Sequence, residues 1–346
     1  MKKLLLIVLT TMSMFSCSET ADEEPIPDVS NVQVEKVSIR RWEKEIFALK
    51  TEQEFSSYLE ENPLFQRYVR SFTPAETSTL WKVMTQFRSF PQTDTLLADV
   101  QQTFSSISDI EKEFEQAFRF LKYYYPEFKQ PQIFTIVSGY GALGFGRDIF
   151  IAEDMMVISL EYFLGEKKMM YYPPEIPMYI LKRYSPQTIV PTTIIMLSAK
   201  YNAYDFQDKT LLADMIFYGK SYYFTKKILP YVPDTLILGY TRAELLACRY
   251  NVDQIWSHFV EYKGENGYGL FYETQEFIKN KYVGERPKTL EIGDECPGRV
   301  GRWLAWEIIK AYMKRNSTMT LPALMEEKNA KYIFEQSKFK PKKPNS

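Results

Sequence analysis

The chain contains a single histidine, His258, and this count restricts the metal chemistry that the sequence can encode. A zinc peptidase motif H-E-x-x-H requires two histidines one helical turn apart, and a structural zinc site requires four clustered ligands. His258 lies in the run Trp256-Ser257-His258-Phe259, inside a helical pattern. We therefore expect His258 to be a structural residue, and we predict neither a metal site nor another cofactor.

Catalytic signatures built on serine or on phosphate binding do not occur in the sequence. There is no G-x-S-x-G pentapeptide and no G-x-x-x-x-G-K-[ST] loop, and a Ser-His-Asp triad would have to use His258. Paired carboxylates can hydrolyse glycosides without any other signature, but the adjacent pairs Glu153-Asp154 and Asp294-Glu295 are expected to point apart as solvated loop charges. We predict no catalytic residue; the alternative is a surface hydrolase (peptidase or glycosidase) without a recognisable signature.

A glycine-rich run over residues 139–146 matches the G-x-G-x-x-G pattern of dinucleotide sites. Such a site needs a helix that opens directly at the third glycine. Here Arg147-Asp148 leads into another strand-like run, so we expect a flexible hairpin connection between two strands.

The N-terminus carries the pattern of a lipoprotein signal peptide. Met1-Lys2-Lys3 precedes an apolar run over residues 4–15, which is too short to span a bilayer as a helix, and Ser16-Cys17 follows it. The site resembles a lipobox, although Met14-Phe15-Ser16 departs from the usual Leu-Ala-Gly. We expect cleavage of residues 1–16 and lipidation of Cys17, which anchors the protein to a membrane. The alternative is a secreted protein with a free Cys17.

The composition of the remaining chain indicates one globular domain. Residues 17–38 are acidic, contain two prolines and show no periodicity, which predicts a tether. The 43 basic and 44 acidic residues nearly balance, which argues against nucleic-acid binding. No second apolar run of about 20 residues occurs, so we expect a single soluble domain over residues 39–336 and a basic tail over residues 337–346. Cys248 and Cys296 could pair in an oxidising compartment, but the sequence does not set their distance.

Hydrophobic spacing predicts an α+β fold that is mostly helical with a small antiparallel sheet. The clearest helix, residues 108–125, is expected to open with a Ser108–Glu111 capping box and to stop at Pro126. Runs rich in β-branched residues predict strands at 132–138, 149–153 and 156–160. Further helical patterns cover residues 42–59, 76–88, 176–202 with interruptions at Pro186 and Pro191, 208–224, 241–262 with a Thr241–Glu244 capping box, and 299–313.

A series of short segments, in order along nearly the whole chain, carries a family resemblance. Besides the lipobox they are residues 41–47 (Arg-Trp-Glu-Lys-Glu-Ile-Phe), 158–165 (Ile-Ser-Leu-Glu-Tyr-Phe-Leu-Gly), 215–224 (Met-Ile-Phe-Tyr-Gly-Lys-Ser-Tyr-Tyr-Phe), 229–234, 239–241, 251–256, 297–301 (Pro-Gly-Arg-Val-Gly), Trp303, Trp306, Tyr312-Met313 and Lys340-Pro341. Taken together, they resemble the gliding-motility lipoprotein GldB family of Bacteroidetes. The resemblance implies an envelope lipoprotein whose partners are envelope proteins of the motility or secretion machinery, and it assigns no catalytic residue.

The acidic residues after Cys17 resemble the surface-export signals of Bacteroidetes lipoproteins. The outer membrane is therefore the expected location, and whether the protein faces the periplasm or the surface stays open.

The order of a small sheet, a loop and two helices also resembles a zincin-type metallopeptidase. At the positions of that fold's metal ligands this chain has Tyr179, Lys182, Arg183 and Tyr184 on the first helix and Tyr218-Gly219-Lys220 on the second. The resemblance implies a degenerate peptidase fold that lacks the metal site. We therefore predict a non-catalytic lipoprotein that binds partner proteins through a pseudo-peptidase cleft, which holds an extended chain by its strand edge. A structural subunit of an envelope complex is a further alternative.

Overall fold

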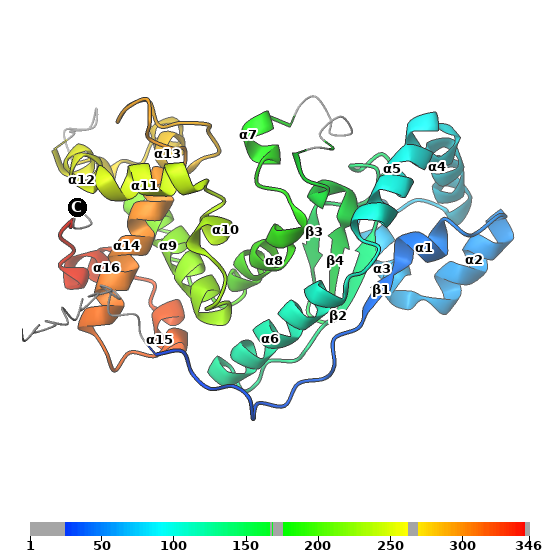
Figure 1. Ribbon diagram of the computed structural model, residues 1–346, viewed down its shortest axis with the longest axis horizontal. Coiled ribbons are helices and arrows are strands. Elements are labelled where there is room, and N and C mark those ends of the chain that lie inside the picture. Colours follow the sequence, from blue (N-terminus) through cyan, green and yellow to red (C-terminus); the bar gives the residue numbers. More distant parts are fainter. Residues whose placement is uncertain (1–24, 167, 169–175, 262–268, 343–346) are drawn as a thin grey trace, which may run out of the picture.

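A mixed four-stranded sheet lies in the first half of the chain in the computed structural model, which describes residues 25–166, 168, 176–261 and 269–342 (Figure 1). The strands are β1 (Ile39–Arg41), β2 (Gln132–Ile136), β3 (Ile149–Ile151) and β4 (Met155–Ser159), in the order β1-β2-β4-β3. β1, β2 and β4 are parallel, and β3 is an antiparallel edge strand. Nearly all of β2 and β4 is buried, as expected for parallel strands that are covered on both faces.

The sequence predicts the positions of three strands correctly and their topology incorrectly. We expected an antiparallel sheet with a hairpin, whereas β2 pairs in parallel with β4 and β3 lies beyond β4. The glycine-rich run therefore connects β2 to β3 past β4 and does not form a hairpin. β1 was not predicted, because it is only three residues long and pairs with a strand far along the chain.

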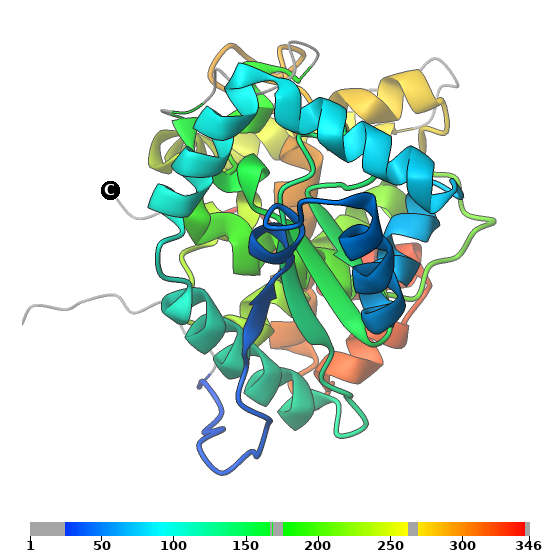
Figure 2. The same cartoon turned by 90° about the vertical axis from the view of Figure 1, so that its right-hand side faces the viewer.

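Helices of the first half cover the sheet, and Figure 2 shows them arranged around its strands. They are α1 (Trp42–Ile46), α2 (Glu52–Glu61), α3 (Pro63–Phe72), α4 (Thr77–Ser89), α5 (Pro91–Thr103) and α6 (Ser108–Tyr124). α4 and α6 confirm the helices expected there. The capping box expected at Ser108 and Glu111 is wrong: Ile107 is the N-cap without a side-chain bond, and Glu111 Oε1 accepts from Ile39 N at 2.9 Å. A tertiary contact with β1 thus replaces the local cap.

The second half is helical and is built around α9 (Leu211–Ile228) and α14 (Val300–Arg315), which lie side by side. Gly219 allows this close approach, because a Cβ there would lie 2.7 Å from the carbonyl carbon of Ala305. The surrounding helices are α7 (Met178–Leu181), α8 (Ile189–Ser198), α10 (Asp234–Leu238), α11 (Arg242–Tyr250), α12 (Val252–Glu261), α13 (Glu276–Val283), α15 (Leu321–Glu326) and α16 (Ala330–Ser337).

Two long helical patterns of this half are divided in the structure. Residues 176–202 form α7, a 3-10 turn (Pro186–Thr188) that Ser185 caps, and α8. The interruption expected at Pro186 is confirmed. The interruption expected at Pro191 is wrong, because Pro191 lies in the first turn of α8, where a helix tolerates proline. Residues 241–262 divide at Asn251 into α11 and α12. The Thr241–Glu244 capping box is confirmed.

Aromatic side chains fill much of the core. Trp42 is fully buried, stacks on Phe134 at a centroid distance of 4.0 Å and meets Phe65 edge-on at 5.0 Å. Trp303 and Trp306 of α14 are buried in the second half. Because aromatic rings bury a large apolar area each, the high tyrosine and phenylalanine content serves packing in both halves.

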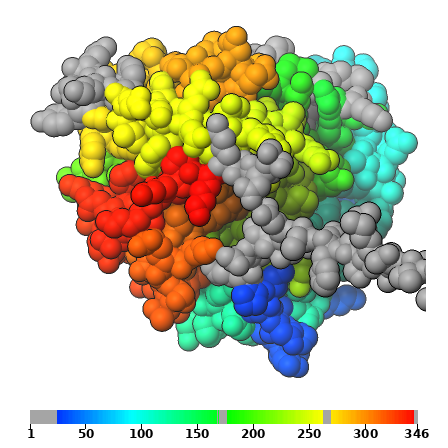
Figure 3. All heavy atoms as spheres, turned by 60° about the vertical axis from the view of Figure 1, so that its left-hand side comes forward, coloured from blue at the N-terminus to red at the C-terminus, as the bar shows by residue number. Residues whose placement is uncertain are grey.

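The stretch before β1 and the stretch after α16 both have contacts with the body. Val29 and Val37 are buried, and Gln130 Nε2 donates to Glu35 O at 3.0 Å; this stretch is the blue ridge at the lower edge of Figure 3. Phe339 meets Trp256 edge-on at 5.2 Å. Described parts of the expected tether (17–38) and tail (337–346) are therefore packed, and residues 17–24 and 343–346 lie outside the described residues.

Candidate functional site

A fully buried carboxyl group, that of Glu161, lies directly after β4 in the short 3-10 helix Leu160–Phe163. Its Oε1 accepts from Ser138 N at 2.8 Å, from Ser138 Oγ at 2.7 Å and from Tyr140 N at 3.2 Å. Oε2 accepts no hydrogen bond from the described residues. Burial raises the pKa of Glu161, although the hydrogen bonds from Ser138 and Tyr140 act in the opposite direction. Desolvation of this carboxyl group therefore outweighs its hydrogen bonds and favours the neutral form more than water would.

The glycine-rich run folds over this carboxyl group. Gly139, Gly141, Gly144 and Gly146 have positive φ, a conformation that glycine adopts without steric cost, and Tyr140 between them has a positive φ as well. At Gly146 a side chain would also overlap with Ser138. The third glycine of the pattern is followed by β3 and not by a helix, so the described chain does not form a dinucleotide site here.

The contact between Ser138 and Glu161 pairs a hydroxyl with a perturbed acid, which are components of some hydrolytic sites. Both side chains are completely buried, and the Ser138 hydroxyl is already engaged with Glu161 Oε1. A nucleophile has to reach its substrate, and this one lies beneath the loop. The arrangement therefore positions the loop, and it does not form an accessible reaction centre.

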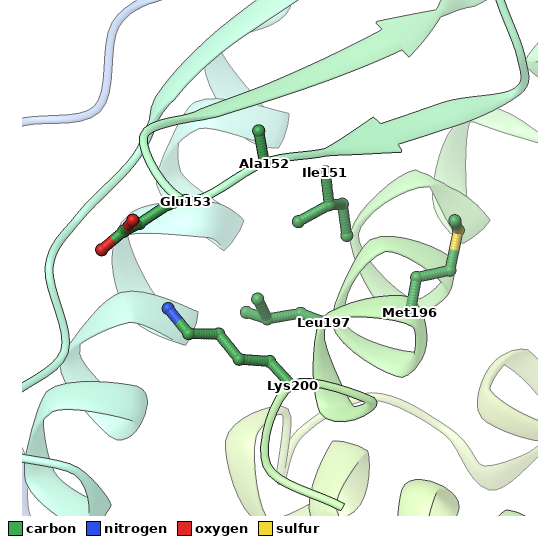
Figure 4. A pocket seen from close by; sticks show the side chains of 6 residues that line it. All are labelled: Ile151, Ala152, Glu153, Met196, Leu197 and Lys200. Carbon is green, nitrogen blue, oxygen red and sulfur yellow. The ribbon is translucent and has the colours of Figure 1, made fainter. Parts of the chain in front are cut away.

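A pocket of about 550 Å³ lies between the edge strand β3 and helix α8 (Figure 4). Its lining combines an apolar surface with two charged side chains: Ile151, Ala152, Glu153, Met196, Leu197 and Lys200. Figure 4 shows Glu153 and Lys200 at one side of the pocket and Met196 at the other. An apolar cavity with a few polar groups at its margin is the usual form of a binding site.

Three of the residues at the expected metal-ligand positions on the first helix divide between two contacts, one at Glu285 and one at Asp148. Tyr179 donates to Glu285 O at 3.0 Å, and Arg183 Nη1 binds Glu285 Oε2 at 2.5 Å. Tyr184 instead donates to Asp148 Oδ2 at 2.5 Å. The structure therefore brings Tyr179 and Arg183 together at Glu285, whereas Tyr184 joins the segment that leads into β3.

Tyr218 and Lys220, which lie on α9 at the second position expected for a metal ligand, have different contacts. Arg302 lies over the ring of Tyr218 at 3.9 Å. Lys220 points elsewhere and donates to the carbonyl oxygens of Ala203, Met325 and Glu327 at 3.0, 3.1 and 2.8 Å. Burial lowers the pKa of Lys220 to about 8. This lysine fixes the chain before α9 to the chain around α15.

The zincin resemblance gains no support from these contacts. In the described ranges, no group of three histidine, cysteine, aspartate or glutamate side chains is placed to hold a metal ion. The fold that is established is mostly helical with a small mixed sheet.

The single histidine and the two remaining cysteines lie in packed surroundings. His258 Nε2 lies 2.8 Å from Tyr282 Oη, and burial lowers the pKa of His258. Cys248 and Cys296 are both buried and unpaired in the structure, and burial raises the pKa of both thiols. A thiol with a raised pKa is a poor nucleophile, so the surroundings of Cys248 and Cys296 favour a structural role for both thiols.

The adjacent acidic pairs point to different partners. Asp154 forms an ion pair with Arg67, whereas Glu153 lines the pocket. Glu295 lies 4.0 Å from Lys288 on the surface. Neither pair converges on a common point in the way that glycoside hydrolysis requires.

Three arginines around Glu285 are a feature that the sequence did not predict as a site. Arg183, which follows α7, meets Arg299 and Arg302, which lie at the start of α14, at this carboxylate. The sequence carries one local signal, since Gly298-Arg299 directly precedes a strong helical pattern. In the structure Arg299 is the N-cap of α14 and has a positive φ.

The expected lipidation residue, Cys17, lies outside the described residues. None of the helices in the described part of the chain has the length and apolar character needed to cross a bilayer.

Comparison with known proteins places the chain in a family. A family model described as gliding motility protein GldB matches residues 22–341. Since this match covers most of the chain, the protein belongs to that family of gliding motility lipoproteins. No curated protein and no solved structure gives a significant match.

Proposed function

We propose that this member of the GldB family is a lipid-anchored, non-catalytic envelope component that binds a protein of the gliding motility or secretion machinery. The partner contributes an extended segment that pairs with the outer edge of β3, a strand that pairs only with β4 among the described residues, and places an apolar side chain in the pocket beside α8. The observation that carries the proposal is the combination of an edge strand and an adjoining apolar pocket.

The outer edge of β3 offers main-chain groups for such pairing. Ala152 N donates to Met155 O at 2.8 Å, and Ser159 N donates to Asp148 O at 2.9 Å. Residues of an antiparallel strand alternate between facing their partner strand and facing away from it. The N–H and C=O of Ile151 therefore point away from β4, toward the side where an added strand would lie.

The lining of the pocket suits one apolar side chain of the partner segment, with the polar main chain of that segment at the pocket margin. Met196 and Ile151 supply apolar surface, while Glu153 and Lys200 supply charge at the margin. Burying one aliphatic or aromatic side chain contributes about 1.5–3 kcal/mol. The pocket alone therefore gives weak affinity, and a lipid anchor that holds the protein near its partner raises the effective concentration.

Lipidation of Cys17 supplies this anchor in our proposal. The N-terminal pattern and membership of a lipoprotein family support it. Acyl chains fix the protein to a membrane without a spanning helix, and we assign that membrane as the outer one.

A surface hydrolase is the competing function, and the described geometry favours it less. The perturbed acid, Glu161, and its neighbour Ser138 are buried beneath the loop. The open pocket has Glu153 and Lys200 as its ionisable side chains, and both lie on its margin in Figure 4.

A pull-down from crosslinked envelopes tests the proposal. The tagged wild-type lipoprotein is compared with Met196→Asp, with Cys17→Ala and with Phe277→Asp, an exposed residue on α13 outside the pocket. We expect motility or secretion components with the wild-type protein and with Phe277→Asp, and their loss with the other two variants. Equal recovery with Met196→Asp would reject the pocket, and recovery of no envelope protein by the wild type would reject partner binding.

A further inference from the structure

Three arginine side chains converge on the carboxylate of Glu285. Arg183 Nη1 lies 2.5 Å from Glu285 Oε2, Arg299 Nε lies 3.7 Å from the same oxygen, and Arg302 Nη1 lies 3.5 Å from Oε1. Arg183 follows α7, Glu285 follows α13, and Arg299 and Arg302 form the start of α14. We call these three arginines and Glu285 the arginine cluster.

The cluster carries more positive than negative charge. The other acceptors are neutral: Arg299 Nη2 donates to Leu238 O at 2.8 Å, and Arg302 Nε donates to Val283 O at 2.5 Å. Carbonyl groups satisfy these donors without neutralising the guanidinium charge. Glu244, which also acts on Arg299, accepts from Thr241 N in the cap of α11. The cluster therefore retains a charge that a further anion would offset.

The arginines are buried enough for charge to matter and open enough to be reached. Their side chains are 18% (Arg183), 8% (Arg299) and 13% (Arg302) exposed, while the Glu285 side chain is 41% exposed. Attraction between charges is stronger in such partly desolvated positions than in bulk water. Glu285 lies at the solvent side, and its removal would uncover the guanidinium groups. Arg299 Nε has no hydrogen-bond acceptor among the described residues.

Neighbouring groups hold the guanidinium planes in place. Arg302 stacks over Tyr218 at 3.9 Å, and Arg299 lies over Tyr240 at 5.5 Å. Gly239 leaves room for the stems, because a Cβ there would lie 2.9 Å from Arg183 Cδ. The N-terminus of the long helix α14 adds positive potential at the same place. Such a fixed, forked arrangement matches a carboxylate.

We propose that Arg183, Arg299 and Arg302 form a carboxylate-binding site for an acidic segment of the partner protein, with Glu285 as an internal carboxylate that the partner's side chain displaces. Glu285 itself demonstrates the ligand class, because its two oxygens are shared among the three arginines. The inference adds a ligand class to the proposed partner binding. It rests on the proposed function only for the identity of the ligand as a protein.

The position of the cluster is compatible with the pocket at β3. Tyr184 directly follows Arg183 and donates to Asp148, which directly precedes β3. One short segment of chain thus contacts both the arginine cluster and the start of the edge strand. A partner segment with acidic residues beside an apolar anchor fits both features.

Binding of a glutamate-rich peptide to the full-length lipoprotein in detergent tests the site. The probe is an acetylated, amidated peptide, its glutamine counterpart is the neutral control, and inorganic phosphate is a third ligand. We expect binding of the glutamate peptide, weakened about tenfold by Arg183→Gln and tightened about fivefold by Glu285→Gln, because charge pairs at partly buried positions dominate such contacts. Arg249→Gln, which removes a surface arginine paired with Asp234, leaves the affinity unchanged.

Three results would overturn the site: equal binding of the glutamine peptide, an unchanged affinity in both Arg183→Gln and Glu285→Gln, or tighter binding of phosphate than of the peptide. Arg183→Lys serves as a second variant if Arg183→Gln fails to fold, and we expect intermediate affinity, since lysine keeps the charge and loses the fork. Failure here with the Met196→Asp effect intact in the pull-down would leave the pocket standing. Success here with no Met196→Asp effect would reject the pocket alone.

Discussion

Glu161 and Glu285 are two glutamates of one chain whose surroundings shift their pKa values in opposite directions. Burial raises the pKa of Glu161, and its partners are the uncharged donors of Ser138 and Tyr140. Burial also acts to raise the pKa of Glu285, but Arg299, Arg183 and Arg302 together hold it below its usual value. Neutral hydrogen bonds thus leave desolvation dominant at the first residue, whereas guanidinium groups outweigh it at the second.

This difference separates the structural role of Glu161 from the binding role that we propose at Glu285. Glu161 is sealed under the glycine-rich loop, and each of its bonds fixes that loop. Glu285 is partly exposed and surrounded by excess positive charge. A ligand has access only to the second of these two surroundings.

Removing the Glu161 side chain is expected to have the largest effect. Glu161→Ala leaves the N–H and hydroxyl of Ser138 and the N–H of Tyr140 buried without an acceptor. Unsatisfied buried donors are costly, so we expect the free energy of unfolding to fall by about 3 kcal/mol. Urea unfolding measures this, with Glu161→Gln as the matched control, because the amide oxygen can still accept. An equal loss in both variants would show that the acceptor is not what holds the loop.

The loop over Glu161 is expected to be the next most sensitive feature. Gly146 has φ of +107°, and a side chain there would overlap with Ser138. Gly165 has φ of +84°, and no atom of the described residues lies within 4 Å of an added Cβ there. We expect Gly146→Ala to cost about 2 kcal/mol through strain plus overlap and Gly165→Ala about 1 kcal/mol through strain alone. Melting temperatures of the two variants would contradict this account if Gly165→Ala were the less stable.

The pH dependence of stability provides the smallest and most direct contrast between the two glutamates. The pKa of Glu161 is higher in the folded protein than its ordinary value of 4.5, which we take for the unfolded chain. The protonated side chain therefore stabilises the fold fully below pH 4.5, and this contribution is lost as pH rises from 4.5 to the folded-state pKa. The pKa of Glu285 is lower in the folded protein than 4.5. The ionised side chain therefore stabilises the fold fully above pH 4.5, and this contribution is lost as pH falls through the folded-state pKa. We therefore expect Glu161→Gln to gain stability relative to wild type as pH rises from 4.5, and Glu285→Gln to gain it as pH falls below 4.5. Urea unfolding across that range, with shifts of the same sign in both variants, would contradict the comparison.

Much of the fold follows from local sequence. The helical pattern around α6, the Thr241–Glu244 cap of α11 and the β-branched runs of β2 and β4 are all in place. These features are determined by neighbours in sequence, such as side-chain periodicity and capping. Pairing between distant segments is not, which explains why β1 and the parallel order of β2 and β4 were not predicted.

The sites were less predictable for the same reason. Arg183 and Glu285 are far apart in sequence, and only the packing of α7 against the chain after α13 brings them together. The sequence does contain a signal for Glu161, because this residue is the single acid inside the apolar run of residues 155–164. Charged residues are rarely buried without a partner, so such an acid points to a buried hydrogen-bonded role. The lipidation of Cys17 stays a prediction.

Photo-crosslinking from the β3 pocket tests the central claim of partner binding most directly. A photoreactive residue is placed at Met196 in the pocket and, as a control, at the exposed Phe277 on α13, in cells that express the full lipoprotein. The account predicts a discrete crosslinked envelope protein from position 196 and none from position 277. Crosslinks from position 277 alone, or none from position 196, would contradict it.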